Sequence, residues 1–388
     1  MGLVMKFEFA TASRIIFGQG TVKKVAPMAS EMGNLALLIT GHNVERAAPL
    51  LESLKNAGMQ IVTFSVSGEP TIKLTIEGVE LARQNASDIV IGMGGGSVID
   101  TAKAIAALLT NCGDIIEYLE VIGQGKPLSN PSAPCIAIPT TAGTGAEVTK
   151  NSVLTSQEHK VKVSLRSPTM LPDLAVVDPE LTYSMPPSLT ASTGLDAFTQ
   201  ILEPFVSVTS NPLTDTLCIE GLKRAAHSLR RAFRDGSDTK AREDMAIVSL
   251  FGGLALANSK LGAIHGIAGP MGGMFPVPHG VICARLLPFV VEANVKALRR
   301  NNSQQYLLRY DQVAQVLTGK PNAKAEEGIA GIHDLIDALG IPELSDFGIM
   351  EDHFPDLIVR SKKASSMKGN PVNLTDEELT EILQKAVS

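Results

Sequence analysis

Three side chains in the second half of the chain have the types and setting of a metal site. Asp196 lies in Thr193-Gly-Leu-Asp196-Ala, and Gln200 follows one helical turn later, so the two would share a helix face. His265 and His279 bracket an apolar segment rich in glycine and proline. One carboxylate and two imidazoles suit a divalent transition metal with a coordination position left open. Spacing alone also allows another interpretation, in which the histidines are structural.

A glycine-rich turn between a predicted strand and a predicted helix is the first candidate for binding a phosphate. It comprises Gly94, Gly95, Gly96 and Ser97. Consecutive glycines let backbone N–H groups approach an oxyanion, and a helix N-terminus adds positive potential. Ser97 would cap the helix and still donate to a phosphate. The spacing is not GxGxxG, and a tight turn required only for packing is the alternative.

A second loop of small and hydroxyl residues follows another predicted strand. It contains Thr140, Thr141 and Thr144 in Pro139-Thr-Thr-Ala-Gly-Thr144. Such a loop could hydrogen-bond a ribose, a pyrophosphate or a carboxamide, or it could be an ordinary connection. Two such loops after strands of one sheet are stronger evidence, because ligands bind at the carboxyl edge of parallel sheets.

Buried strands alternating with helices must position these two loops. Short apolar runs predict strands at 35–39, 60–64, 88–91, 135–138 and 174–177, with helices such as 47–57 and 74–85 between the early ones. After the prolines at 179, 186 and 187 the pattern is helical. The sequence therefore predicts an α/β N-terminal dinucleotide-binding domain with a parallel sheet, residues 1–182, and an all-α C-terminal domain, residues 183–388.

Composition and charge exclude several classes of protein. Of the 388 residues, 44% are hydrophobic and only 19% charged, which excludes a disordered chain. A net charge of −6 leaves no basic surface for nucleic acid or anionic lipid. No signal peptide or membrane-length apolar run is visible, and three of the four cysteines have apolar neighbours and are expected in the core. We expect a cytoplasmic protein without a membrane or nucleic-acid partner.

Five motifs in a fixed order identify a family resemblance. They are Gly94-Gly-Gly-Ser97, Pro139-Thr-Thr-Ala-Gly-Thr144, Pro172-Asp-Leu-Ala-Val-Val-Asp178-Pro-Glu-Leu181, Thr193-Gly-Leu-Asp196-Ala and Pro278-His-Gly280. Together the chain resembles the iron-containing alcohol dehydrogenases, over nearly its whole length. The resemblance implies NAD(P)-dependent hydride transfer to or from a small alcohol, aldehyde or ketone. It also implies the two domains described above, and we expect a homodimer.

The resemblance further implies a metal held by one aspartate and three histidines. Asp196, His265 and His279 match three of these positions, but the fourth is Gln200, a weaker ligand for iron. A histidine that many members carry four residues after the third ligand is Gly269 here. Three explanations stay open. Asp196, His265 and His279 alone could hold zinc, or the site could hold iron or another metal weakly, with Gln200 or water completing the shell. The third is a metal-independent reductase resembling maleylacetate reductase.

The same resemblance implies which residues contact the cofactor. The backbone from Gly94 to Ser97 would receive the pyrophosphate, and further contacts would come from Thr140, Thr141, Thr144 and Lys162. Without the family, Lys162 would be interpreted as a surface charge. A non-catalytic nucleotide-binding protein of the same fold is the alternative function, and the three intact metal positions argue against it.

The choice between NAD and NADP depends on the loop after the second expected strand. An aspartate there would favour NAD by binding the free ribose hydroxyl and repelling a 2′-phosphate. This chain has Gly41 at that position, followed by His42 and Asn43, whose side chains could donate to a phosphate. The sequence therefore favours NADP, although a simple loop with His42 in solvent is the alternative.

Overall fold

The computed structural model describes residues 6–387, and within them the chain forms two compact units. One unit comprises residues 12–186 and 236–246 and contains the β-sheet. The other comprises residues 6–11, 187–235 and 247–387 and is built from helices.

A six-stranded parallel sheet is the centre of the first unit. Its order is β1-β8-β5-β4-β2-β3, with bounds Arg14–Phe17 (β1), Leu35–Gly41 (β2), Gln60–Val66 (β3), Ile89–Gly94 (β4), Cys135–Pro139 (β5) and Leu174–Val177 (β8). The chain runs from β2 outward to β3 and then returns to β4 on the other side of β2. The order therefore reverses between β2 and β4, which is where open parallel sheets bind ligands.

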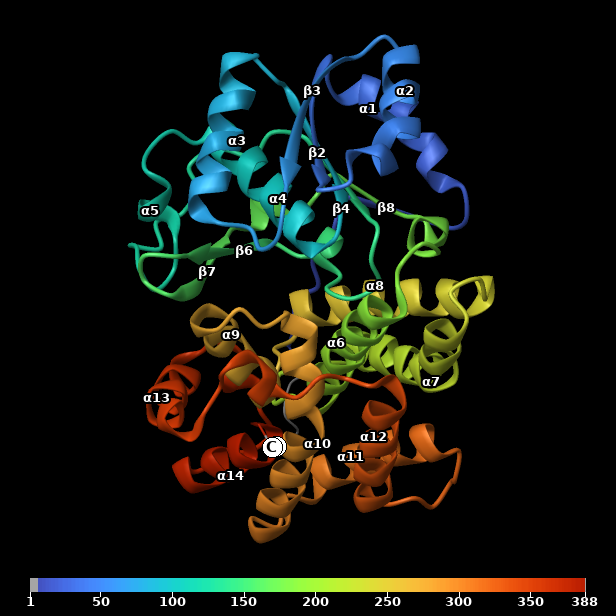
Figure 1. Cartoon of the computed structure of the whole chain (residues 1–388), viewed down its shortest axis with the longest axis vertical. Coiled ribbons are helices and arrows are strands. Elements are labelled where there is room, and N and C mark those ends of the chain that lie inside the picture. The colour runs from blue at the N-terminus through green and yellow to red at the C-terminus, as the bar shows by residue number, and fades with distance from the viewer. Residues whose placement is uncertain (1–5, 388) are drawn as a thin grey trace. The chain divides into compact units, whose positions relative to one another are not determined.

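Helices cover both faces of this sheet, as the continuous apolar strands predict. Helices α1 (Val25–Met32) and α2 (Ala48–Asn56) lie on one face, and α3 (Ile72–Gln84) and α4 (Gly96–Thr110) lie on the other (Figure 1). Side chains alternate between the faces, so Leu38 packs in the core with α1 and α2, while Leu37 packs in the core with α3 and α4. Burial of both faces makes every position of β4 inaccessible to water.

The five predicted strands are confirmed, and three further strands were not predicted. β1 pairs with β8 at the edge of the sheet, and it is short and only partly buried. β6 (Asn151–Ser156) and β7 (Val161–Arg166) form a separate antiparallel hairpin. In β6 one face is fully buried and the other half-buried, an alternation that carries a weaker sequence signal than a continuous apolar run.

The second unit contains α6 (Pro187–Val206), α7 (Pro212–Arg234), α9 (Ala263–Met274), α10 (His279–Arg300), α11 (Gln304–Thr318), α12 (Ala325–Leu339), α13 (Phe354–Lys363) and α14 (Asp376–Val387). Helix α8 spans Thr239–Asn258. The predicted helical pattern is confirmed, since no strand follows β8 within residues 6–387. The structure also makes the Gly- and Pro-rich segment after position 262 a helix, α9, with Pro270 inside it.

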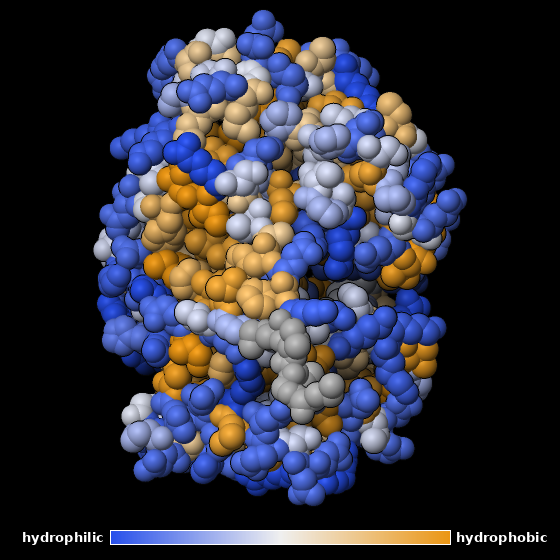
Figure 2. Space-filling view, turned by 180° about the vertical axis from the view of Figure 1, so that it is seen from behind, coloured by the Kyte–Doolittle hydropathy of each residue, from blue (hydrophilic) through white to orange (hydrophobic). Residues whose placement is uncertain are grey.

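The exterior shows hydrophobic residues in patches among hydrophilic ones (Figure 2). Among residues 6–387, no single helix is both long and apolar enough to cross a membrane. The pair α8 and α9 meets the length and composition criteria together, but its two helices are bent by 96°.

Candidate functional site

Helix α6 places three polar side chains on one buried face. Asp196, Gln200 and Glu203 are each only 3% exposed, although all three side chains are polar. Their spacings of four and seven residues bring them to the same side of an α-helix. Gly252 of α8 lies directly against this face, because a Cβ there would be 3.2 Å from Cβ of Gln200. Such complete burial of polar groups requires partners inside the protein.

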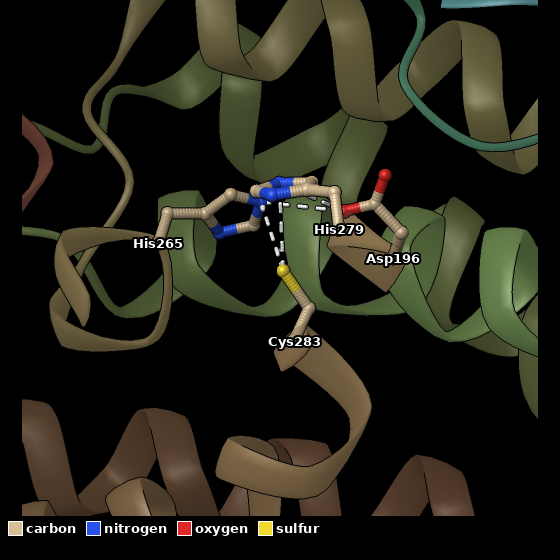
Figure 3. A group of neighbouring side chains, drawn as sticks. All are labelled: Asp196, His265, His279 and Cys283. Atoms are coloured by element: carbon tan, nitrogen blue, oxygen red, sulfur yellow. Dashed lines mark hydrogen bonds and ion pairs between the residues drawn. The ribbon is translucent and has the colours of Figure 1, made fainter. Parts of the chain in front are cut away.

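Helices α9 and α10 bring the partners. His265 lies in the first turn of α9, and His279 is the first residue of α10. Cys283 follows His279 by one helical turn and points to the same cluster (Figure 3). The ligand atoms of Asp196, His265, His279 and Cys283 all lie within 4.8 Å of one another. The structure thus brings together the aspartate and both histidines singled out from the sequence.

The separations within the cluster fit donors around a small cation. Nε2 of His265 lies 3.4 Å from Oδ1 of Asp196, and Nε2 of His279 lies 3.8 Å from the same oxygen. Sγ of Cys283 is 3.8 Å from Nε2 of His265 and 3.6 Å from Nε2 of His279. A tetrahedral shell with bonds of about 2.0–2.3 Å places neighbouring donors roughly 3.3–3.8 Å apart. All four separations are at or near this range.

Glu203 fixes the orientation of the His265 ring. Its Oε2 lies 2.6 Å from Nδ1 of His265, and its Oε1 accepts a hydrogen bond of 2.6 Å from the backbone N–H of Ile264. Gly262 permits this close approach, since a Cβ there would lie 2.9 Å from Oε1. With Nδ1 donating to the carboxylate, Nε2 of His265 faces the cluster as a donor atom for a metal. Histidine ligands are commonly held by a carboxylate in this way.

The buried side chains of the cluster shift one another's pKa values. Burial alone would raise the pKa of Asp196, but its contacts with His265 and His279 and a hydrogen bond from Gln200 hold that pKa below its ordinary value. Burial would lower the pKa of His265, yet the neighbouring Cys283 and Glu203 raise it well above the usual value. Burial raises the pKa of the Cys283 thiol to about 11.

The residues present fit a metal ion. Oδ1 of Asp196 is buried and has no hydrogen-bond partner within the described chain, although it lies between two imidazoles. A buried carboxylate oxygen left in this state is costly unless a cation completes it. His279 is 31% exposed at its side chain, whereas the other three residues are buried, so the cluster is accessible from the His279 side.

Two members of this site were not predicted from the sequence. Cys283 was expected to be a small core residue, and it is buried, but its sulfur contacts both histidines. Glu203 was given no role. Helical spacing could have predicted both, because Cys283 is four residues after His279 and Glu203 is seven after Asp196, so each shares a helix face with a predicted ligand. The neighbourhood of Gly269, where many members of the resembling family carry a histidine, is open, with no atom within 4 Å of a Cβ built there.

In the first unit, the two predicted loops pack against each other at the carboxyl edge of the sheet. The backbone N–H of Thr140 donates to the carbonyl of Gly94 at 2.9 Å. A Cβ at Gly96 would lie only 2.8 Å from the side chain of Thr144, so only glycine permits this contact without rearrangement. The expectation that Ser97 caps α4 is wrong, because the helix begins at Gly96 and its N-cap is Gly95. Ser97 lies instead inside the first turn.

The buried Lys103 binds the segment that follows the threonine loop. Its Nζ donates to the carbonyl of Ala146 at 2.9 Å and to Oγ1 of Thr149 at 2.8 Å, and it pairs with Asp100 at 3.0 Å. Glu147 is buried beside this lysine, and burial raises its pKa to about 7. These buried polar groups therefore fix the segment that directly follows the threonine loop.

The remaining predicted cofactor residues lie around the same sheet. Gly41 ends β2, which neighbours β4, and nothing lies within 4 Å of a Cβ built there. The exposed His42 has Nδ1 3.2 Å from Oγ of Ser67, and the Asn43 side chain accepts from the N–H of Glu45. Lys162, on β7, pairs with Glu69 at 3.0 Å, so the structure does not leave it as an isolated surface charge.

Known proteins resemble this chain over its full length. Residues 12–179 match the family described as iron-containing alcohol dehydrogenase, and residues 190–387 match the C-terminal family of Fe-containing alcohol dehydrogenases. A choline dehydrogenase of Bacillus subtilis is 34% identical, over 96% of this chain and 92% of its own. A 1,3-propanediol dehydrogenase of Klebsiella pneumoniae is 33% identical, over 98% of both chains.

Solved structures agree with these sequence relatives. A crystal structure of a 1,3-propanediol oxidoreductase has a TM-score of 0.91 and 32% identity, covering 98% of this chain and all of that one. An alcohol dehydrogenase from Oenococcus oeni has a TM-score of 0.90 and 33% identity, with the same coverage. The ordered motifs, the two-part fold and the buried Asp-His-His cluster have one common explanation: this chain belongs to the iron-containing alcohol dehydrogenase family.

Proposed function

We propose that this chain interconverts a small alcohol and its aldehyde or ketone with NAD(P), assisted by a divalent metal held by Asp196, His265 and His279. Its family makes it a hydride-transfer oxidoreductase acting on alcohols. The observation that supports the metal is the buried Oδ1 of Asp196, which lies between two imidazole nitrogens and has no hydrogen-bond partner among the described residues. An ion there would act as a Lewis acid on the alcohol or carbonyl oxygen while the nicotinamide gives or takes the hydride.

The chain's own residues supply position and electrostatics. Asp196 contributes negative charge in a buried setting, and Glu203 holds His265 with Nε2 toward the cluster. The partly exposed His279 marks the side from which substrate would enter. The Gly94–Gly96 turn and the first turn of α4 offer backbone N–H groups for the cofactor pyrophosphate, and Thr140, Thr141, Thr144 and Lys162 would make the further contacts.

We propose small alcohols as the substrate class. The relatives are named for choline, 1,3-propanediol and methanol, which share a hydroxyl-bearing carbon and little else. What supports a common site is the ligand cluster, because it can act on the oxygen and need not contact the remainder of the molecule.

We also propose that NADP serves at least as well as NAD. Gly41 presents no side chain at the end of β2, and the exposed His42 and the amide of Asn43 follow it. A 2′-phosphate would therefore meet two possible donors and no carboxylate of these three residues. Values of kcat/KM for the two nucleotides test this choice.

Metal content and activity measured on the same preparation test the function. We expect about one divalent metal per chain, oxidation of alcohols from a panel with NAD or NADP, and loss of activity on chelation that is reversed by metal. Full activity without metal would favour a metal-independent reductase. Nucleotide binding without turnover of any alcohol, aldehyde or ketone would favour a non-catalytic role.

A further inference from the structure

We infer that Cys283 is the fourth ligand of the metal site, so that the donor set of this chain is Asp196, His265, His279 and the Cys283 thiolate, and that this set prefers zinc to iron. The inference rests on the proposed function only in requiring that a metal is bound there. It assigns to Cys283 the place that the family gives to a third histidine.

The first observation is that the Cys283 sulfur lies close to both imidazoles. Cys283 is fully buried on α10, and Figure 3 shows its side chain directed at the two imidazoles. Its Sγ lies 3.8 Å and 3.6 Å from their Nε2 atoms. These separations are those of two donors sharing one tetrahedral ion, roughly 3.3–3.8 Å. A cysteine buried only for packing would need no imidazole on its sulfur.

The second step is independent of the sulfur. Oδ1 of Asp196, in a side chain that is 4% exposed, points into the same group and has no hydrogen-bond partner within residues 6–387. An oxygen, two nitrogens and a sulfur thus converge within 4.8 Å. This convergence of four donor atoms defines a ligand shell and not merely a thiol near a histidine.

Gln200 has a different partner. Its side chain hydrogen-bonds the Asp196 carboxylate. Because the amide donates to a ligand, we assign Gln200 the role of a positioning residue for Asp196 and not that of a fourth donor. The loss of the histidine at 200 therefore leaves a four-donor site intact, because α10 supplies the sulfur.

The donor types decide the metal. Thiolate is a soft ligand, and mixed Cys-His sites are typical of zinc, whereas iron in oxygen- and nitrogen-rich sites has no need of sulfur. Binding would replace the thiol proton with a metal–sulfur bond and release that proton to solvent. Four protein donors do not close such a site to substrate, because catalytic zinc reaches five-coordination.

Cobalt(II) substitution tests the ligand directly, without an activity assay. The full chain is stripped with a chelator and titrated with Co²⁺, and the near-ultraviolet thiolate-to-cobalt charge-transfer band is recorded. We expect one Co²⁺ per chain with this band in the wild type and in Cys218→Ser, a matched control for a buried cysteine of the same unit. Cys283→Ser should lose the band, and its zinc affinity should fall at least about tenfold.

The outcomes separate this inference from the proposed function. Stoichiometric Co²⁺ without the band would overturn the thiolate ligand and leave the metal site standing. A wild type that binds no metal, yet oxidises alcohols, would overturn both. If Cys283→Ser does not fold, a variant that keeps Cys283 alone (Cys112→Ser, Cys135→Ala, Cys218→Ala) must retain the band. A tighter apparent affinity for Fe²⁺ than for Zn²⁺ would overturn the metal preference.

Discussion

The ligand cluster and the cofactor loops differ in how their polar groups find partners. The cluster gathers four ionisable side chains from three helices, and the buried Oδ1 of Asp196 has no hydrogen-bond partner within residues 6–387. The loops at the sheet edge consist of glycine and threonine, and they satisfy each other through contacts such as Thr140 N–H to Gly94.

This difference shows what each region needs from its ligand. The loops already pack against each other, and a cofactor would meet pre-positioned backbone N–H groups at a helix N-terminus. The cluster is electrostatically incomplete, so an ion would contribute to its stability as well as to chemistry. Mutations should accordingly affect metal content in one region, and affect cofactor choice and loop stability in the other.

The largest effect is expected from Asp196→Asn, which removes the negative charge but keeps the shape. Metal content should fall well below one per chain, and kcat/KM should fall at least about a thousandfold, since Lewis-acid stabilisation is worth several kcal/mol. Elemental analysis and steady-state kinetics measure both. Asp334→Asn, at an exposed ion pair with Arg230, is the control and should change neither. Full metal content in Asp196→Asn would contradict the assignment.

The next effect concerns the loop region and depends on pH. Burial raises the pKa of Glu147 from 4.5 to about 7. The folded protein therefore binds this proton more tightly than the unfolded chain does. The stability gained in this way is complete below pH 4.5 and is lost as pH rises through 7. Glu147→Gln cannot ionise, and above pH 8 it should be more stable than the wild type by about 3 kcal/mol, at 1.36 kcal/mol per pKa unit.

Urea unfolding of both proteins at pH 5 and pH 8.5 measures this difference. The gap should widen with pH, whereas Glu158→Gln, at the exposed turn of the β6–β7 hairpin, should match the wild type at both values. If Glu147→Gln and the wild type have equal free energies of unfolding at pH 8.5, burial of the Glu147 carboxylate does not destabilise the folded protein.

A smaller effect is expected from Glu203→Gln, which weakens the partner of His265 without removing a ligand. Loss of such an oriented carboxylate typically costs 10–100-fold in metal affinity. Competition with a chromophoric chelator measures this change, and cofactor affinity should be unaffected. Unchanged metal affinity would mean that His265 is held by packing alone.

The smallest effect is the cofactor choice at Gly41. Gly41→Asp would place a carboxylate beside the ribose, and it should shift kcat/KM toward NAD by about tenfold, or 1.4 kcal/mol, with unchanged metal content. The space around Gly41 admits the side chain. A wild type that already prefers NAD by more than tenfold would refute the proposed NADP preference.

The sequence by itself determined the parts that depend on local pattern. Continuous apolar runs such as 135–138 identify strands buried on both faces, and glycine and threonine after two of them identify loops at the carboxyl edge. His265 and His279 stood out because they bracket an apolar segment, and the family motifs then matched Asp196 and both histidines to metal-ligand positions. Ser97 was misassigned as a cap because the helix begins two residues earlier than a cap at Ser97 would place it.

Only the tertiary structure decided which side chains meet. Cys283 has apolar sequence neighbours and Glu203 lies in an apolar helix, so neither differs locally from a residue of the core or of a helix end. Their roles arise because α6 packs against α10, which is distant in the sequence, and α9 packs against the same helix, so that Asp196, His265 and Cys283 meet at one point. Local pattern encodes periodicity and turn chemistry, whereas contacts between distant helices depend on how their buried faces fit together.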